Sequence, residues 1–247
     1  MADSPDPIVP EEDAAVVYET IDMLLERDDL TDADAHMLGL VATSDKPGVN
    51  TTFTDRTVSD ARWVAFERQL DELGWPYEFT AWPRNEGSWA VSYLYAADDE
   101  WFAEHMFGYE MRLPVERMGS FYGYDERDVE YFTQCDGMVA CIVRKWMADN
   151  FDSFDATLDD MAYLEFVYNV IEPTEERLYE AIETGKERYE RLLDLADAAD
   201  SDALRDSVET YLEHERDSWE RTLDYDDETW EGLLCCEKDE WDDILPE

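Results

Sequence analysis

The sequence predicts an α+β fold that is mostly helical, with an aromatic β-hairpin, a third strand and a C-terminal antiparallel pair of helices. Three observations indicate this class. Apolar residues recur at intervals of three and four over much of the 247-residue chain, which is the spacing of one helix face. Aromatic residues alternate with other residues over 77–82 and 88–95, which is strand periodicity. Two long helical patterns then follow Pro173.

The N-terminal part of the chain is expected to be a flexible lead followed by helices. Residues 1–10 contain three prolines, and a helical pattern begins at Glu11. Thr31 and Ser59 are suited to cap two further helices, and residues 45–50 break the chain between them. The apolar positions that support these three helices are Val17, Ile21 and Leu24; Met37, Leu38 and Val41; and Trp63, Phe66, Leu70 and Leu73.

The aromatic hairpin is predicted from two alternating runs. Residues 77–82 and 88–95 flank the segment 83–87, which contains a proline and a glycine. Two strand-like runs around a short turn are typical of a β-hairpin. Four side chains of the second run, Trp89, Val91, Tyr93 and Tyr95, would then share one face of the hairpin.

Short helices are expected to follow the hairpin. One begins at the acidic residues 98–100, where carboxylates favour a helix N-terminus. Another begins at Asp125, with Val129 and Phe132 facing inward. After Gly137 the apolar spacing is again helical, and a strand is the alternative there.

The third strand is predicted at residues 164–171. This run is rich in aromatic and β-branched residues and ends before Pro173. A continuous helix from Leu158 is the alternative interpretation. A long helix then starts at Thr174, a turn follows at 198–202, and a second helix runs on to residue 223.

The domain organisation expected from these patterns is simple. No repeat and no glycine-, serine- or proline-rich linker divides the chain, so residues 11–223 should form a single α+β domain. It ends in the helical pair 174–223. The remaining segment, 224–247, alternates acidic residues with Trp230, Leu233, Leu234, Trp241 and Ile244, and is expected to be either a short docked helix or an exposed tail.

The charge of the chain is its strongest compositional signal. It has 65 acidic and 19 basic residues, for a net charge of −46, and the acids are spread along its whole length. Such a surface holds water and hydrated K⁺ or Na⁺, and multimolar salt screens its self-repulsion. We therefore expect a haloarchaeal, cytoplasmic protein. Clustered cations for nucleic-acid binding are missing, and so are a membrane-spanning apolar run and a signal peptide.

The same charge predicts that folding depends on salt. In dilute buffer, self-repulsion should partly unfold the protein, and multimolar KCl should restore the fold. Far-UV circular dichroism as a function of KCl concentration measures this. A fully folded, cooperative spectrum without added salt would contradict the prediction.

The cysteines and histidines do not form a recognisable metal motif. Cys135 and Cys141 are six residues apart, and Cys235 and Cys236 are adjacent, whereas structural zinc sites use pairs with two to four intervening residues. Reduced thiols are the favoured interpretation, and we assign no metal ligand and no cofactor from the sequence. The phosphate-loop, dinucleotide, serine-hydrolase and HExxH signatures are also missing, so no catalytic residue is assigned.

A candidate binding site is predicted around two segments. His105 lies one helical turn after Glu100, and a carboxylate there would raise the pKa of the imidazole. The segment 119–132 is dense in aromatic residues, runs into a helix whose N-terminus could accept an anion, and has arginines nearby. A packed helix–helix corner is the alternative interpretation. The candidate residues are Glu100, His105, Arg117, Tyr122, Tyr124, Arg127 and Tyr131.

The residues 123–132 also carry a resemblance. This stretch resembles the Gly-[Tyr/Phe]-Pro-x-Cys-Cys-[Val/Ile]-x-x-Phe box of an archaeal family of uncharacterised proteins, and residues 167–185 are similar to the second half of that family. The likeness covers about residues 115–195. Gly123, Tyr124, Val129 and Phe132 match the box, but Asp125, Arg127 and Asp128 replace its proline and its cysteine pair. The resemblance therefore implies no thiol chemistry and no activity for this chain.

Three functions are open on these grounds. The leading hypothesis is binding of a small molecule or a protein partner. The second is a metal-assisted hydrolase or other enzyme that uses carboxylates with His105 or His214. The third is an interaction protein that acts through the C-terminal helices and the tryptophans of segment 224–247.

Overall fold

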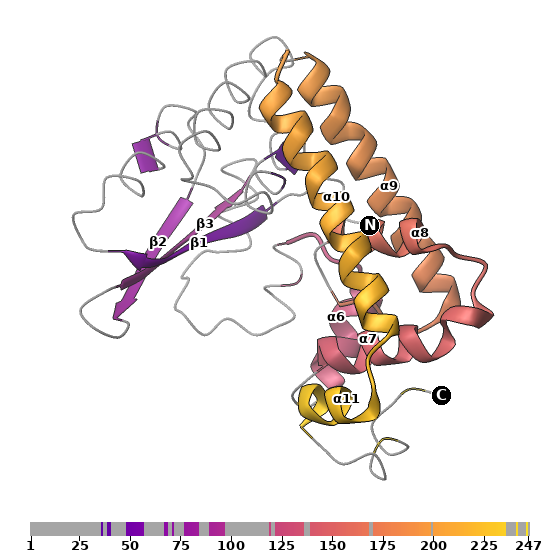
Figure 1. Cartoon of the computed structure of the whole chain (residues 1–247). Helices are drawn as coiled ribbons and strands as arrows, with labels where there is room; N and C mark the ends of the chain where they lie inside the picture. The colour runs from indigo at the N-terminus through magenta and orange to yellow at the C-terminus, as the bar shows by residue number, and fades with distance from the viewer. Residues whose placement is uncertain are drawn as a thin grey trace. The chain divides into compact units, whose positions relative to one another are not determined.

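The computed structural model shows two compact units (Figure 1). Unit 1 comprises residues 1–123 and 191–208, and unit 2 comprises residues 124–190 and 209–247. The residues that the structure describes are 36, 39–40, 48–56, 67–68, 71, 77–83, 89–96, 119, 122–135, 139–167, 170–198, 200–235, 241 and 246. The predicted lead at 1–10 and the predicted helices that begin at Glu11, Ser59 and Asp98 lie wholly or largely outside them.

Unit 1 contains a small antiparallel sheet. Its strands are β1 (Gly48–Arg56), β2 (Tyr77–Pro83) and β3 (Trp89–Ala96), in the order β1-β3-β2. The central strand pairs on both sides, so that Tyr93 lies opposite Thr51 of β1 and Phe79 of β2. The register shifts between Phe53 and Arg56. Strand β1 starts inside the segment 45–50 that the sequence suggested was only a break, and its threonines suit a strand.

The α+β class predicted from the sequence is wrong, because the residues that the structure describes are mostly helical. Between residues 124 and 235, the described part of the chain forms helices and short 3-10 turns and contains no strand. The predicted third strand at 164–171 is not formed, because Leu164–Phe166 is a 3-10 turn (η3) that continues directly from helix α8 (Leu158–Tyr163). The predicted class is therefore not retained, although β2 and β3 pair antiparallel over the two runs that were predicted to form the hairpin.

The start of α8 gives the physical reason for this correction. Thr157 caps the helix: its hydroxyl accepts from the backbone N–H of Asp160, and the Asp160 carboxylate accepts from the N–H of Thr157. This reciprocal capping box satisfies two N–H groups that a helix start otherwise leaves unpaired. Helix formation at residue 158, followed by burial of Leu164 and Phe166, outweighs the β propensity of the run.

The remaining helices belong to unit 2 or continue from it into unit 1. They are α6 (Glu126–Gln134), α7 (Val139–Asn150), α9 (Glu175–Ala198), α10 (Asp202–Leu223) and α11 (Asp227–Leu234), with a 3-10 turn, η2 (Phe151–Ser153), after α7. The predicted helix start at Asp125 is confirmed. The predicted inward position of Phe132 is wrong, since its side chain is 39% exposed and Asp128 is buried on that helix instead.

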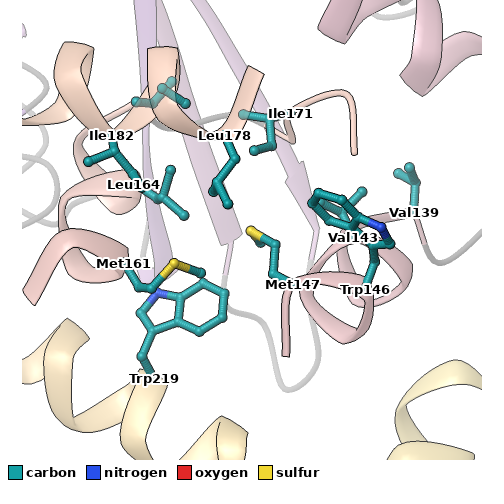
Figure 2. Close-up of a cluster of buried hydrophobic side chains, with 12 residues drawn as sticks. Val139, Val143, Trp146, Met147, Met161, Leu164, Ile171, Leu178, Ile182 and Trp219 are labelled. Carbon is teal, nitrogen blue, oxygen red and sulfur yellow. The ribbon is translucent and has the colours of Figure 1, made fainter. Parts of the chain in front are cut away.

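The core of unit 2 gathers side chains from α7, α8, α9 and α10 (Figure 2). The helical spacing predicted after Gly137 is confirmed, because Val139, Val143 and Trp146 of α7 are all buried there. Trp219 of α10 closes the cluster beside Met161. The other members are Met147, Leu164, Val167, Ile171, Leu178, Ala181 and Ile182. Burial of this apolar surface is the main favourable term for the fold of the unit.

Unit 1 buries a histidine together with the tip of the α9–α10 pair. His36 and Leu40 are fully buried, as are Leu192 and Leu204 from the two helix ends. Ser201 links those ends, because its backbone N–H donates to the Ala196 carbonyl and its hydroxyl caps α10. Burial lowers the pKa of His36 to about 3, against a smaller raising effect of a backbone hydrogen bond with Ser207. His36 is therefore a neutral core residue near pH 7.

Within the described residues, none of the helices combines the length and the apolar character that crossing a bilayer requires.

Candidate functional site

Four of the seven predicted binding residues lie in the part of the chain that the structure describes. Tyr122, Tyr124, Arg127 and Tyr131 are placed at the start of α6 and along it. Glu100, His105 and Arg117 lie outside the described residues. The geometry of the predicted site can therefore be followed on its α6 side.

The N-terminus of α6 is capped by the side chain of its own N-cap residue. The carboxylate of Asp125 accepts from the backbone N–H of Arg127 at 2.9 Å. Hydrogen bonding from Arg127 also holds the pKa of Asp125 below its usual value. Gly123 supports the entry into the helix with a φ of 68°, which glycine adopts without strain. One of the N–H groups that an external anion would use is thus already occupied by a carboxylate of the chain.

Arg127 is committed to two ion pairs on the surface of unit 2. Its guanidinium contacts Asp125 at 3.0 Å and also Glu180 of α9. These bonds tie the start of α6 to α9. An exposed pair of this kind contributes little to stability, because solvent screens it. The two ion pairs of Arg127 fix the orientation of α6 relative to α9.

Beneath this surface lies a buried ion pair that the sequence did not single out. Asp128 is only 2% exposed and receives three hydrogen bonds from the Arg177 guanidinium of α9. The Nε donates to Oδ1 at 3.0 Å and to Oδ2 at 3.1 Å, and the Nη2 donates to Oδ2 at 2.7 Å. The backbone N–H of Glu172 donates to the same carboxylate at 2.7 Å. In a chain with 65 acids, one more carboxylate carries no signal, and only its inward position on α6 could have identified it.

The tyrosines of the segment pack rather than line an open pocket. Burial raises the pKa of Tyr124 to about 12, while the Arg188 charge acts in the opposite direction. Burial and a hydrogen bond with Cys135 raise the pKa of Tyr131 as well. Both phenols are therefore neutral near pH 7. On the α6 side, the predicted site has the geometry of a packed helix corner.

A second cluster in unit 2 brings two glutamates together, and sequence reasoning missed it. Glu165 follows α8 in η3, and Glu215 lies on α10. Burial raises the pKa of Glu165, the Glu215 charge raises it further, and the Arg144 charge lowers it. The Glu165 side chain is still 32% exposed, so a ligand can reach it. Fifty residues separate the two glutamates in sequence, and only the packing of η3 against α10 pairs them.

Arg144 of α7 is the cation nearest to this pair, but other groups hold it. Its Nη1 lies 3.7 Å from Glu165 Oε1, a long contact. Its Nε donates to Thr222 at 3.0 Å and its Nη2 to Ser218 at 2.9 Å. The guanidinium also stacks over Trp219, 4.5 Å from the ring centroid. Arg144 is therefore anchored to α10 and only partly neutralises the carboxyl pair.

His214 joins the edge of the same cluster. Its Nδ1 lies 3.1 Å from Glu215 Oε1, while most of the ring is exposed to solvent. The imidazole therefore contacts one of the two carboxyls.

The described residues also bear on the hypotheses about metal binding, thiols and the C-terminal tryptophans. No three His, Cys, Asp or Glu residues gather as metal ligands among the described residues. Cys135 and Cys141 are half-buried free thiols, and Cys235 is an exposed one. Trp230 and Trp241, which the third hypothesis uses for partner contact, are buried against Ile142 of α7.

Comparison with protein-family models, curated proteins and solved structures gives no significant match for this chain. The resemblance over residues 115–195 therefore stays a prediction, and the functional argument rests on the geometry of unit 2.

Proposed function

We propose that the chain is a cytoplasmic protein of a salt-in cell that binds a positively charged group of a small molecule or protein partner at Glu165 and Glu215. The observation that supports this proposal is the pairing of two carboxyls around a desolvated Glu165 whose pKa is raised. Two like charges held together in a poorly solvated place cost free energy. A cation bound between them removes that cost.

Arg144 compensates the charge of the two carboxyls only partly. Arg144 forms its shorter hydrogen bonds with Ser218 and Thr222, and its Nη1 lies 3.7 Å from the Glu165 carboxylate. An incoming ammonium or guanidinium group would add the second cation that a pair of carboxylates requires. His214 is placed to respond, because its imidazole already contacts Glu215.

High salt should favour binding of a cationic ligand at Glu165 and Glu215 over binding to the rest of the acidic surface. At 1 M salt the Debye length is about 3 Å, so fully solvated carboxylates attract a ligand only weakly. Partly buried charges are screened much less. Among 65 acids, the desolvated pair is therefore the place where a specific electrostatic contact survives in a salt-rich cytoplasm.

An acid–base enzyme is the second candidate, and one observation favours it. A carboxyl with a raised pKa beside a second carboxyl is the arrangement by which enzymes separate a general acid from its partner. His214 would then act on Glu215 as a proton relay. Binding remains the leading proposal because it needs only the two carboxyls.

Spermine, a linear tetra-amine, tests the proposal in about 2 M KCl. We expect its addition to shift the Glu165 carboxyl carbon in ¹³C NMR to saturation. Replacement E165Q or E215Q should weaken spermine binding by at least about tenfold, measured by calorimetry, since hydrogen bonds to charged groups are worth about 1.5–3 kcal/mol. Binding to the wild type should strengthen as pH rises through the elevated pKa of Glu165, because the deprotonated form is the one that pairs with a cation.

The matched control is E220Q, which removes the same charge from an exposed position of the same helix. It should leave spermine binding unchanged. Equal weakening by E220Q and E165Q would show that spermine only follows the diffuse negative charge, and the proposed site would be rejected. Loss of the pH dependence in E165Q alone would identify Glu165 as the titrating group.

A further inference from the structure

The C-terminal helix α11 and Trp241 are attached to α7 by a cluster of their own. Ile142 of α7, Trp230 and Leu234 of α11, and Trp241 form this cluster, which is separate from the main core of unit 2. Cys141 packs against it from α7. An isolated helix of eight residues is not stable in water, so the helical state of α11 depends on this docking.

A buried lysine lies at the centre of the attachment. Lys145 is only 5% exposed, and its ammonium lies 5.5 Å from the ring centroid of Trp230 and 4.6 Å from that of Trp241. The same ammonium pairs with Asp149 one turn later on α7. Each indole contact is a cation–π interaction, which is strongest when the cation is desolvated. Two rings from the C-terminal segment thus share one cation of α7.

Charge opposes this attachment. Residues 224–247 contain eleven acidic side chains and one lysine, a net charge of −10, which leaves −36 on the rest of the chain. Like charges of this size repel strongly at low ionic strength and weakly at multimolar salt. The apolar and cation–π contacts do not rely on screening. The balance between docking and release is therefore set by the salt concentration.

We infer that α11 and Trp241 form a salt-controlled strap, docked on α7 at high salt and released at lower salt while the main core of unit 2 stays folded. Release uncovers Ile142, the Cys141 thiol and the Lys145 ammonium on one face of α7. The small cluster should open before the twelve-residue core, because local stability follows the amount of buried apolar contact. The inference is independent of the ligand proposed for Glu165 and Glu215.

Thiol labelling tests the strap, and the chain supplies an internal control. Cys141 packs against the strap cluster, whereas Cys135 packs against the main core. As KCl is lowered from about 3 M, iodoacetamide labelling of Cys141 should accelerate at least about tenfold at a salt concentration where labelling of Cys135 is unchanged. Tandem mass spectrometry separates the two sites. Simultaneous acceleration at both cysteines would overturn the inference, because it would report general unfolding.

Two sets of variants test separately the contacts that hold the strap on α7 and the charge that opposes them. W241A should raise the rate of Cys141 labelling at 3 M KCl to about its low-salt value. K145M should do the same, because it removes the cation that both indole rings contact. K186M removes a lysine from α9 that pairs with Asp160 and should have no effect. Unchanged labelling in W241A would contradict the strap.

The second set of variants tests the charge of residues 224–247 with four substitutions. D239N, E240Q, D242N and D243N together should move release to a lower KCl concentration, because they reduce the segment charge from −10 to −6. The control replaces four exposed acids of α9 and α10, with E187Q, D206N, E213Q and E220Q. It lowers the charge of the rest of the chain only from −36 to −32 and should move release much less. Equal shifts in both variants would refute control by the segment charge.

Discussion

Replacing Asp128 by alanine is expected to lower the free energy of unfolding by about 3–5 kcal/mol. Asp128 receives three hydrogen bonds from Arg177 and one from the backbone of Glu172, and both side chains of the ion pair are buried. Without this carboxylate, the buried guanidinium keeps a long contact with Glu180, 3.8 Å from Nη1 to Oε2, which compensates its charge only partly. Urea unfolding in about 3 M KCl, followed by circular dichroism, measures the change without altering the ionic strength.

Two companion variants make the result interpretable. R127A breaks only exposed ion pairs and should leave the free energy of unfolding nearly unchanged, because solvent screens such pairs. The double replacement D128L with R177M removes both charges and should recover most of the lost stability, because a buried ion pair and an apolar pair of similar volume are often close in energy. A cost below about 1 kcal/mol for D128A would mean that the pair does not hold α6 to α9.

Replacing Gly185 by alanine is expected to cost about 3 kcal/mol or more. A Cβ at this position of α9 would lie 2.0 Å from the Tyr163 carbonyl oxygen and 2.7 Å from its carbon. Both atoms are backbone, so no side chain can move away, and α9 would have to separate from the end of α8. The main core, which joins Leu178 and Ile182 of α9 to Met161 of α8, would be opened.

Gly232 provides the control for this substitution. It also lies in a helix, α11, but a Cβ there would meet nothing within 4 Å. G232A should be neutral or stabilise by up to about 1 kcal/mol, because alanine favours the helix more than glycine does. Thermal unfolding of both variants at the same KCl concentration gives the comparison. Similar melting temperatures for G185A and G232A would show that the close approach at Tyr163 is easily relieved.

Local helix signals were read correctly from the sequence where apolar spacing and a capping residue agreed. Asp125 was predicted to start a helix and caps α6, and the stripe at Val139, Val143 and Trp146 is buried along α7. The run 164–171 was misread because its aromatic and β-branched residues suit a strand as well as a buried helix. The capping box at Thr157 decides for the helix, and the class predicted from that run was wrong.

The candidate site shows a different limit of sequence reasoning. Tyr122 to Tyr131 stood out because aromatic residues, glycines and arginines are rare enough in this chain to be noticed. Glu165, Glu215 and Asp128 did not, because each is one carboxylate among 65. Their significance comes from position alone, since one is desolvated beside another carboxyl and one is buried under an arginine.

The net charge and the spacing of neighbouring residues can be read from the amino-acid sequence alone. The charge predicts a dependence of folding on salt, and the spacing predicts most helices of unit 2. Only the tertiary structure decided which carboxylates are desolvated, which are paired, and that Trp230 and Trp241 enclose Lys145. The physical reason is that desolvation and pairing depend on groups brought together from distant segments. Spacing along the chain carries no record of them.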